Sequence, residues 1–278
     1  MKEIRHPAPA PASLPRPASP SRLPVLFVGH GSPMNAIADN RWSQAFRALG
    51  ETLPRPRAIL VVSAHWFGPG IQVTANPEPP TIHDFAGFPP ELHAIRYPAP
   101  GDPGHAARVR ALLGAEHVTP SLDWGIDHGA WSVLAHLRPA ADCPVVELRM
   151  DTRRAPAAHL TLGRLLTPLR DEGILILASG NITHNLRHAF ASLERGETSP
   201  PPWAAEFDAA VARAASAHDV EYLTRALDGD AGRLAHPTPD HYWPLLYAVG
   251  AASPDDKVEF PIAGFDMASL SMRAVRFG

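Results

Sequence analysis

Three histidines each follow a short apolar run that predicts a buried strand. They are His30, His65 and His184, and each lies no more than six residues beyond its run. In a largely parallel sheet the carboxyl ends of the strands lie along one edge, with neighbours about 5 Å apart, so side chains distant in sequence can converge there. Neutral imidazole is the commonest metal ligand in proteins. The pattern therefore predicts a metal site at one edge of a sheet.

A structural role is the alternative for any one of these histidines. A lone histidine at a strand end is more often a hydrogen-bonded residue of the core than a ligand. His30 lies between Gly29 and Gly31, and glycine lets the backbone turn sharply and approach another group closely. Repetition at three strand ends, each beside glycine or other small residues, favours ligands over structural residues.

Two more histidines lie in rigid loops that lead into predicted helices. His128 lies in the glycine-bracketed turn Trp124-Gly-Ile-Asp-His-Gly-Ala-Trp131, and His241 lies in the proline-rich loop Pro237-Thr-Pro-Asp-His-Tyr-Trp-Pro244. Asp127 either caps the helix that follows it or orients a histidine through its second ring nitrogen. Three aromatic residues beside histidine-containing segments are candidates for the wall of a site, although each alone is more often a core residue: Trp66, Phe85 and Tyr242.

The composition narrows the kind of metal site. Cys143 is the one cysteine of the chain, so a thiolate-rich zinc site and an intrachain disulfide are both excluded. Three or four nitrogen ligands without a thiolate suit Zn²⁺ or Fe²⁺, and we expect one ion per chain. Other chemistries fit less well. No G-x-S-x-G motif of a hydrolase is present, and Gly29 and Gly31 lack the third glycine and the downstream acid of a dinucleotide site.

The bulk composition indicates a globular protein of ordinary charge. Of 278 residues, 45% are hydrophobic and 19% are charged, and the formal net charge of -3 gives no sign of a nucleic-acid partner. No run approaches the roughly 18 apolar residues that a membrane helix needs, and we expect a cytoplasmic protein. Residues 1–22 are rich in proline and alanine without the apolar centre of a signal peptide. We interpret them as a disordered tail before a single domain at 23–278.

Predicted strands alternate with predicted helices along the chain. Strands are expected at 25–28, 58–63, 71–74, 145–148, 174–178, 258–262 and 269–277. Helices are expected at 42–49, 105–113, 131–137, 157–169, 203–228 and 245–252. Segment 71–74 is expected to form a hairpin with 58–63, whose unbroken apolar run is typical of a strand covered on both faces. The alternation predicts an α/β fold, a three-layer α/β/α sandwich with a central mixed, largely parallel sheet.

Seven ordered motifs of this chain resemble those of a known family. The motifs are Gly29-His-Gly-Ser-Pro-Met34, Ser63-Ala-His-Trp66, Pro80-Thr-Ile-His-Asp-Phe85, Tyr97-Pro-Ala-Pro-Gly101, Gly125-Ile-Asp-His-Gly129, Ala178-Ser-Gly-Asn181 with His184-Asn185-Leu186, and Pro237-Thr-Pro-Asp-His-Tyr242. Together they resemble the 4,5-DOPA extradiol dioxygenase family, which belongs to the class III extradiol ring-cleavage dioxygenases. The resemblance runs from about Leu23 to the C-terminus.

The resemblance implies an enzyme that inserts both atoms of O₂ into a catechol such as DOPA and opens the ring. The implied metal ligands are His30, His65, His184 and His241. His128 is implied to lie near the substrate, where a neutral imidazole can accept a catechol proton, and His184 competes for this role if it is not a ligand. The wider class combines two histidines with a glutamate around ferrous iron, but no glutamate occupies a matching motif here. A four-histidine set suits zinc, which is redox-inert.

Two other functions stay open from the residues alone. A zinc hydrolase that uses a metal-bound hydroxide fits a four-histidine set, but no glutamate general base is evident beside the ligands. A metal-holding interaction protein on the same fold would catalyse nothing. The sequence does not decide which catechol is used or which bond beside the hydroxyls, 4,5 or 2,3, is cut. It is also compatible with a homo-oligomer.

Overall fold

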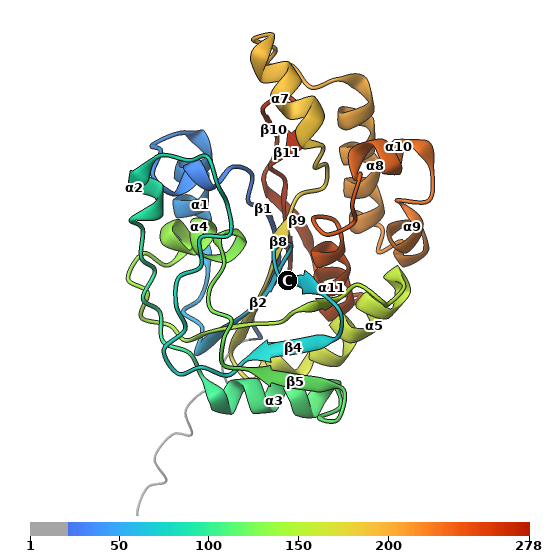
Figure 1. The fold of residues 1–278 in the computed structure, drawn as a ribbon. Coiled ribbons are helices and arrows are strands. Elements are labelled where there is room, and N and C mark those ends of the chain that lie inside the picture. The colour runs from blue at the N-terminus through green and yellow to red at the C-terminus, as the bar shows by residue number, and fades with distance from the viewer. Residues whose placement is uncertain (1–21) are drawn as a thin grey trace, which may run out of the picture.

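A six-stranded sheet forms the centre of the fold in a computed structural model, which describes residues 22–278 (Figure 1). In spatial order its strands are β6 (Val145–Glu147), β2 (Ala58–Ser63), β8 (Ile174–Gly180), β1 (Val25–Gly29), β12 (Ala274–Phe277) and β9 (Val258–Ile262). Strands β6, β2, β8 and β1 are parallel to one another, whereas β12 is antiparallel to both β1 and β9. The predicted mixed, largely parallel sheet is confirmed.

The central strands are apolar on both faces. Successive side chains of a strand point to opposite sides of the sheet. In β2, Leu60 and Val62 therefore face one core, whereas Ile59 and Val61 face the other. Strands β1 and β8 alternate in the same way, and every residue of the three strands is buried. Such burial is expected of parallel strands that have a layer of helices on each side.

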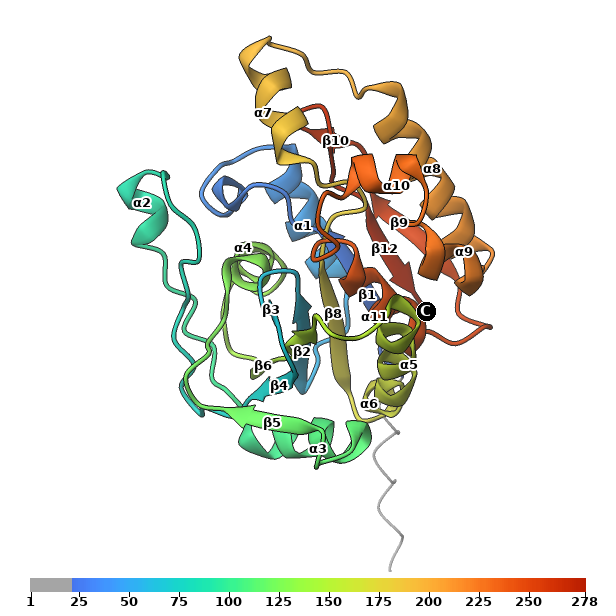
Figure 2. The same ribbon diagram turned by 45° about the vertical axis from the view of Figure 1, so that its right-hand side comes forward.

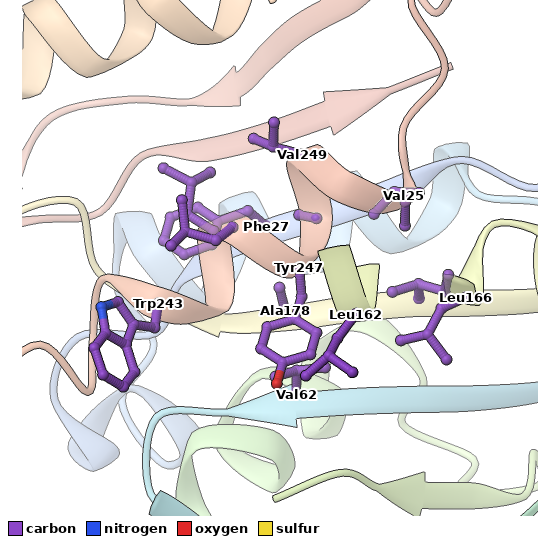
Figure 3. Packing of buried hydrophobic residues seen from close by; sticks show 14 of the residues in the cluster. Val25, Phe27, Val62, Leu162, Leu166, Ala178, Trp243, Tyr247 and Val249 are labelled. Carbon is purple, nitrogen blue, oxygen red and sulfur yellow. The ribbon is translucent and has the colours of Figure 1, made fainter. Parts of the chain in front are cut away.

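Helices cover both faces of the sheet, which gives the predicted three layers (Figures 1 and 2). On one side lie α1 (Arg41–Thr52) and α4 (His128–Leu137), and on the other lie α5 (Pro156–Leu166) and α11 (Trp243–Ala251). Figure 3 shows the second of these cores, where Phe27 of β1 and Val62 of β2 lie close to Leu162 of α5 and Tyr247 of α11. Every residue of helix α11 is buried, which explains why the helix is apolar on all sides.

A small second sheet lies beside the main one. It consists of β4 (Ile71–Thr74), which pairs in parallel with β5 (Val118–Ser121). The expected hairpin between 71–74 and 58–63 is therefore wrong. Strand β5 has the sequence Val-Thr-Pro-Ser, whose proline and single apolar residue gave no strand signal. Proline is tolerated because a strand of a two-stranded sheet has a free edge that needs no N–H donor.

Shorter elements complete the described chain. They are the 3₁₀ helix η1 (Pro33–Ala36), α2 (Pro90–His93), α3 (Pro103–Leu113), α6 (Pro168–Asp171), α7 (Leu186–Glu194), α8 (Pro202–Ser216), α9 (Val220–Arg225), α10 (Asp230–Ala235), β3 (Phe67–Gly68), β7 (Met150–Asp151), β10 (Phe265–Asp266) and β11 (Leu270–Ser271). No helix among residues 22–278 is both long enough and apolar enough to span a membrane.

Three predicted segments are divided in the structure. The helix expected at 157–169 is divided at Pro168, because proline has no N–H to donate to the carbonyl four residues before it. The helix expected at 203–228 ends at α8 and resumes as α9, with His218 between them at a left-handed φ of 51°. The strand expected at 269–277 is divided into β11 and β12. The predicted tail at 1–22 lies outside the described residues apart from its last residue.

Candidate metal centre

Five histidine rings gather at the carboxyl edge of the parallel strands. His30 follows β1, His65 follows β2 and His184 follows β8, while His128 begins α4 and His241 lies just before α11. The ring centroid of His30 lies 5.1 Å from that of His65, 5.2 Å from that of His241 and 5.9 Å from that of His128. Because β1, β8 and β2 are adjacent and parallel, residues far apart in sequence meet at one place.

The ring of His30 is buried and held in one tautomer. Its Nδ1 lies 2.9 Å from Ser179 Oγ, and Ser179 Oγ donates its own proton to Gly129 O at 2.5 Å. The hydroxyl can therefore only accept from His30, so Nδ1 carries the proton and Nε2 has a free lone pair. The next residue, Gly31, has a φ of 64°, and a Cβ there would overlap the sulfur of Met272. Glycine at this turn is what allows His30 to occupy its place.

One carboxylate holds two of the histidines. Asp84 Oδ2 lies 3.1 Å from His65 Nδ1, and Asp84 Oδ1 lies 2.9 Å from His128 Nδ1. A carboxylate only accepts hydrogen bonds, so both rings are protonated at Nδ1 and present Nε2. Burial by itself raises the pKa of Asp84, but its hydrogen bonds to His128 and His65 and their charges outweigh this effect, so the pKa is lowered. Asp84 is therefore ionised whenever the site is assembled.

The Nε2 atoms of His30 and His65 face each other at 3.3 Å. With Nδ1 protonated on both rings, two neutral imidazoles would bring two lone pairs into contact. A cation between the two nitrogens, either a proton or a metal ion, removes this repulsion. Burial lowers the pKa of His65, but Asp84, Asp127 and Asp240 outweigh it and the pKa is raised. The pair is thus arranged to hold positive charge, which is what a metal site requires.

His241 is placed by a close contact with the end of β8. The N–H of Asn181 donates to His241 O at 2.9 Å, and a Cβ on Gly180 would overlap that same carbonyl. His241 Nδ1 contacts a carboxylate oxygen of Asp240, which leaves Nε2 free. The ring of His184 stacks on that of His241, with centroids 3.4 Å apart and an interplanar angle of 4°. Imidazole lone pairs lie in the ring plane, so two stacked parallel rings do not point at one ion.

Burial keeps most of these rings neutral. It lowers the pKa of His30 and His241 well below the usual value and that of His184 to about 3, and neighbouring histidines add to the effect because two positive rings repel each other. Burial and the charge of His65 also lower the pKa of His128. Neutral imidazole is the form that binds a metal ion. His30, His65 and His128 offer nitrogen atoms within 4.8 Å of one another, so the donor set fits a divalent cation.

The rings of His128 and His184 are placed differently relative to the other histidines. His128, expected near the substrate, offers a ring nitrogen within 4.8 Å of those of His30 and His65, and its ring centroid lies 3.7 Å from that of His65. His184, expected to be a ligand or a proton carrier, stacks on His241. Asp127 accepts the Ala130 N–H at 3.1 Å, which confirms that it caps α4.

The three candidate wall aromatics occupy different places. Phe85 lies edge-on to the His128 ring, with centroids 5.3 Å apart. Trp66 stacks on Trp124 beside His65. Tyr242 is buried in the core, and its hydroxyl donates to the carbonyl of Leu223, so it is a structural residue.

Two acidic residues of the site were not identified from the sequence. Asp84 lies in the family motif Pro80-Thr-Ile-His-Asp-Phe85, where a carboxylate next to a histidine was a signal. Glu147 ends β6, where an acid in a buried apolar strand is itself anomalous. Its Oε1 accepts the Asp127 N–H at 3.0 Å and its Oε2 accepts the Trp124 indole N–H at 3.1 Å. Burial and the charge of Asp127 raise the pKa of Glu147 well above its usual value, which favours the neutral acid.

Comparison with known proteins assigns the class. Residues 24–278 match the family described as the catalytic LigB subunit of aromatic ring-opening dioxygenase, and the chain belongs to this family. It is thus an extradiol aromatic ring-opening dioxygenase. This finding favours the dioxygenase over the hydrolase and over the metal-holding interaction protein.

Individual relatives are similar over almost their whole length. The chain is 48% identical over 264 residues to 4,5-DOPA dioxygenase extradiol of Escherichia coli (strain K12), covering 94% of this chain and 96% of the relative. It is 37% identical over 269 residues to 4,5-DOPA dioxygenase extradiol of Beta vulgaris, covering 91% and 96%. The crystal structure of uncharacterized protein JW3007 from Escherichia coli K12 has a TM-score of 0.79 at 43% identity and covers 92% of this chain and 100% of that one.

Proposed function

We propose that this chain opens the ring of a catechol such as DOPA, using O₂ and one Zn²⁺ or Fe²⁺ ion. The observation that carries the proposal is the pair of Nε2 atoms of His30 and His65, which face each other at 3.3 Å while a separate acceptor holds each Nδ1. Similarity to proteins named 4,5-DOPA dioxygenase extradiol supports the choice of a catechol. We place the activity in one domain at 23–278 and in the cytoplasm.

We propose His30, His65 and His241 as the metal ligands. Each has its Nδ1 held by an oxygen acceptor, which fixes the tautomer that presents Nε2 to a metal. His184 was expected to be either a fourth ligand or a proton carrier. Its stack on His241 favours the second role, because the lone pairs of parallel rings point past each other. Burial lowers its pKa to about 3, so the ring is neutral in the metal-free protein.

His128 is the proposed acceptor of the first catechol proton. A divalent cation in this site supplies Lewis acidity toward the catechol oxygens, and ferrous iron adds a redox capacity that zinc lacks. His128 begins neutral because burial lowers its pKa, and its Nδ1–H donates to Asp84. The carboxylate then stabilises the imidazolium that forms when Nε2 takes a proton. Phe85 packs against this ring, with centroids 5.3 Å apart.

The test is reconstitution under defined conditions. Metal-free protein is loaded with Fe²⁺ or with Zn²⁺ under anaerobic conditions, and DOPA is then added in air. We expect a yellow ring-opened product with one O₂ consumed per ring. The variant His128→Ala should keep its metal and lose turnover by about 10²-fold or more, the usual contribution of a general acid or base. Product without O₂ uptake would indicate hydrolysis, and no O₂ uptake with any catechol would refute the proposal.

A further inference from the structure

A cavity of about 740 Å³ lies beside the histidine cluster and includes His65 in its wall. Its aromatic side is formed by Trp66 and Trp124, whose ring centroids lie 5.3 Å apart with an interplanar angle of 6°. The Trp124 indole N–H donates to buried Glu147 at 3.1 Å, which fixes the plane of that ring. A proposed metal ligand and a rigid aromatic surface therefore share one cavity of the size that small-molecule sites have.

Arg149 supplies a fixed positive charge to the same wall. Its Nε donates to Gly70 O at 3.0 Å and its Nη2 donates to Pro69 O, so two backbone carbonyls hold the guanidinium in place. Within residues 22–278, no carboxylate lies within ion-pair distance of it. Arg153, two residues further on, is different because it pairs with Asp151 at 3.0 Å. Arginine stays charged in proteins, so Arg149 presents to the cavity a cation that no direct ion pair among the described residues occupies, although the charge of Asp151 acts on it.

We propose that this cavity receives the side chain of the substrate and that Arg149 recognises a carboxylate on it. The inference rests on the proposed function, in which the catechol ring lies at the histidine cluster. The side chain then extends along Trp66 and Trp124 to the guanidinium, whose planar fork suits a carboxylate. Asp123 also lines the cavity, so an ammonium group beside that carboxylate has a partner of opposite charge. Arg149 is thus the residue that selects a catechol with an acidic side chain over one with a neutral side chain.

Steady-state kinetics with matched catechols test the assignment. DOPA and 3-(3,4-dihydroxyphenyl)propanoate carry the carboxylate, whereas 4-methylcatechol does not. Arg149→Gln should lower kcat/KM for the two acids by about 10-fold or more, mainly through KM, because a hydrogen bond to a charged group is lost. Turnover of 4-methylcatechol should not change. The matched control is Arg164→Gln, which removes an exposed charge on α5 outside the cavity lining and should affect neither class. Equal losses for acidic and neutral catechols, or no loss for the acids, would overturn the proposal.

A binding measurement separates this inference from the proposed function. 3-Phenylpropanoate cannot be cleaved, and its affinity for the protein is measured by calorimetry beside that of neutral 3-phenylpropan-1-ol. We expect the acid to bind more tightly than the alcohol to the wild-type protein and to lose this advantage in Arg149→Gln. If that result holds and no catechol is opened, the proposed function fails while the subsite stands. If catechols are opened but the acid binds no better than the alcohol, the subsite assignment is wrong.

Discussion

Replacing Asp84 by asparagine should separate two functions that one carboxylate now serves. An amide has a single carbonyl oxygen, so only one of His65 and His128 can keep its Nδ1–H hydrogen bond. The other ring meets an NH₂ donor and must accept through Nδ1, which moves its proton to Nε2. On His65 that proton blocks a metal ligand, and on His128 it blocks the proposed base. The same change of tautomer explains how an asparagine can disable a catalytic histidine while its geometry stays intact.

The expected loss of metal affinity and turnover in Asp84→Asn follows from the hydrogen bonds of Asp84. Each hydrogen bond between a histidine and the charged Asp84 contributes about 1.5–3 kcal/mol, and loss of such an outer partner weakens metal binding by about 10–100-fold. Zn²⁺ affinity is measured by competition with a chelator, and turnover is measured on the reconstituted enzyme. We expect at least one of the two to fall in Asp84→Asn. The control Asp39→Asn removes an exposed carboxylate whose partner is Arg47 and should change neither. Wild-type metal affinity together with wild-type turnover in Asp84→Asn would refute the reasoning.

Three further outcomes are expected. His30→Ala should abolish metal retention, seen by elemental analysis, while circular dichroism shows the fold intact; stoichiometric metal in this variant would remove His30 from the ligand set. Gly180→Ala should cost about 1–3 kcal/mol in urea unfolding, because its Cβ would overlap His241 O, whereas Gly229→Ala, with nothing within 4 Å of the new Cβ, should cost less. The pKa of His184 is lowered to about 3 from 6.5, so the folded state favours the neutral ring. The stability that this ring contributes is complete above about pH 6.5 and is lost as the pH falls toward 3. The Tm of metal-free protein should therefore drop over this range, and by less in His184→Gln; an equal drop in both would contradict the assignment.

The sheet could be predicted because its strands carry their own signal. A parallel strand between two helical layers must be apolar on both faces, and runs such as Ile174–Gly180 are unbroken for that reason. Strand direction then placed His30 and His65 at one edge without knowledge of any contact. Ring orientation decides which histidine nitrogens lie within reach of one metal ion, and the sequence pattern does not give ring orientation. Stacking of His184 on His241 is set by the packing of loops, which periodicity does not report.

The loop that carries Asp84 shows why the remainder could not be predicted. Its path is fixed by contacts with the segment before α4: Ile82 N–H donates to Ile126 O at 2.7 Å, and Ile126 N–H donates to Pro80 O at 2.8 Å. Only this short bridge joins the two segments, so neither needs the alternation of apolar and polar residues that marks a strand. Asp84 therefore reaches His65 and His128 through tertiary contacts between irregular segments, and a single sequence contains no periodic signal for such contacts.

The position of β1 in the middle of the sheet has a consequence for how the chain is made. Val25 pairs with Ile176 of β8 on one side and with Phe277 of β12 on the other. At about 5–20 residues per second, a ribosome needs on the order of tens of seconds to deliver the second partner after the first strand. The apolar strand lacks both neighbours until β8 is made and still lacks one until β12 is made, and non-local pairing of this kind also slows folding. The first strand of a newly made chain therefore stays open to wrong pairing until the last strand has been made.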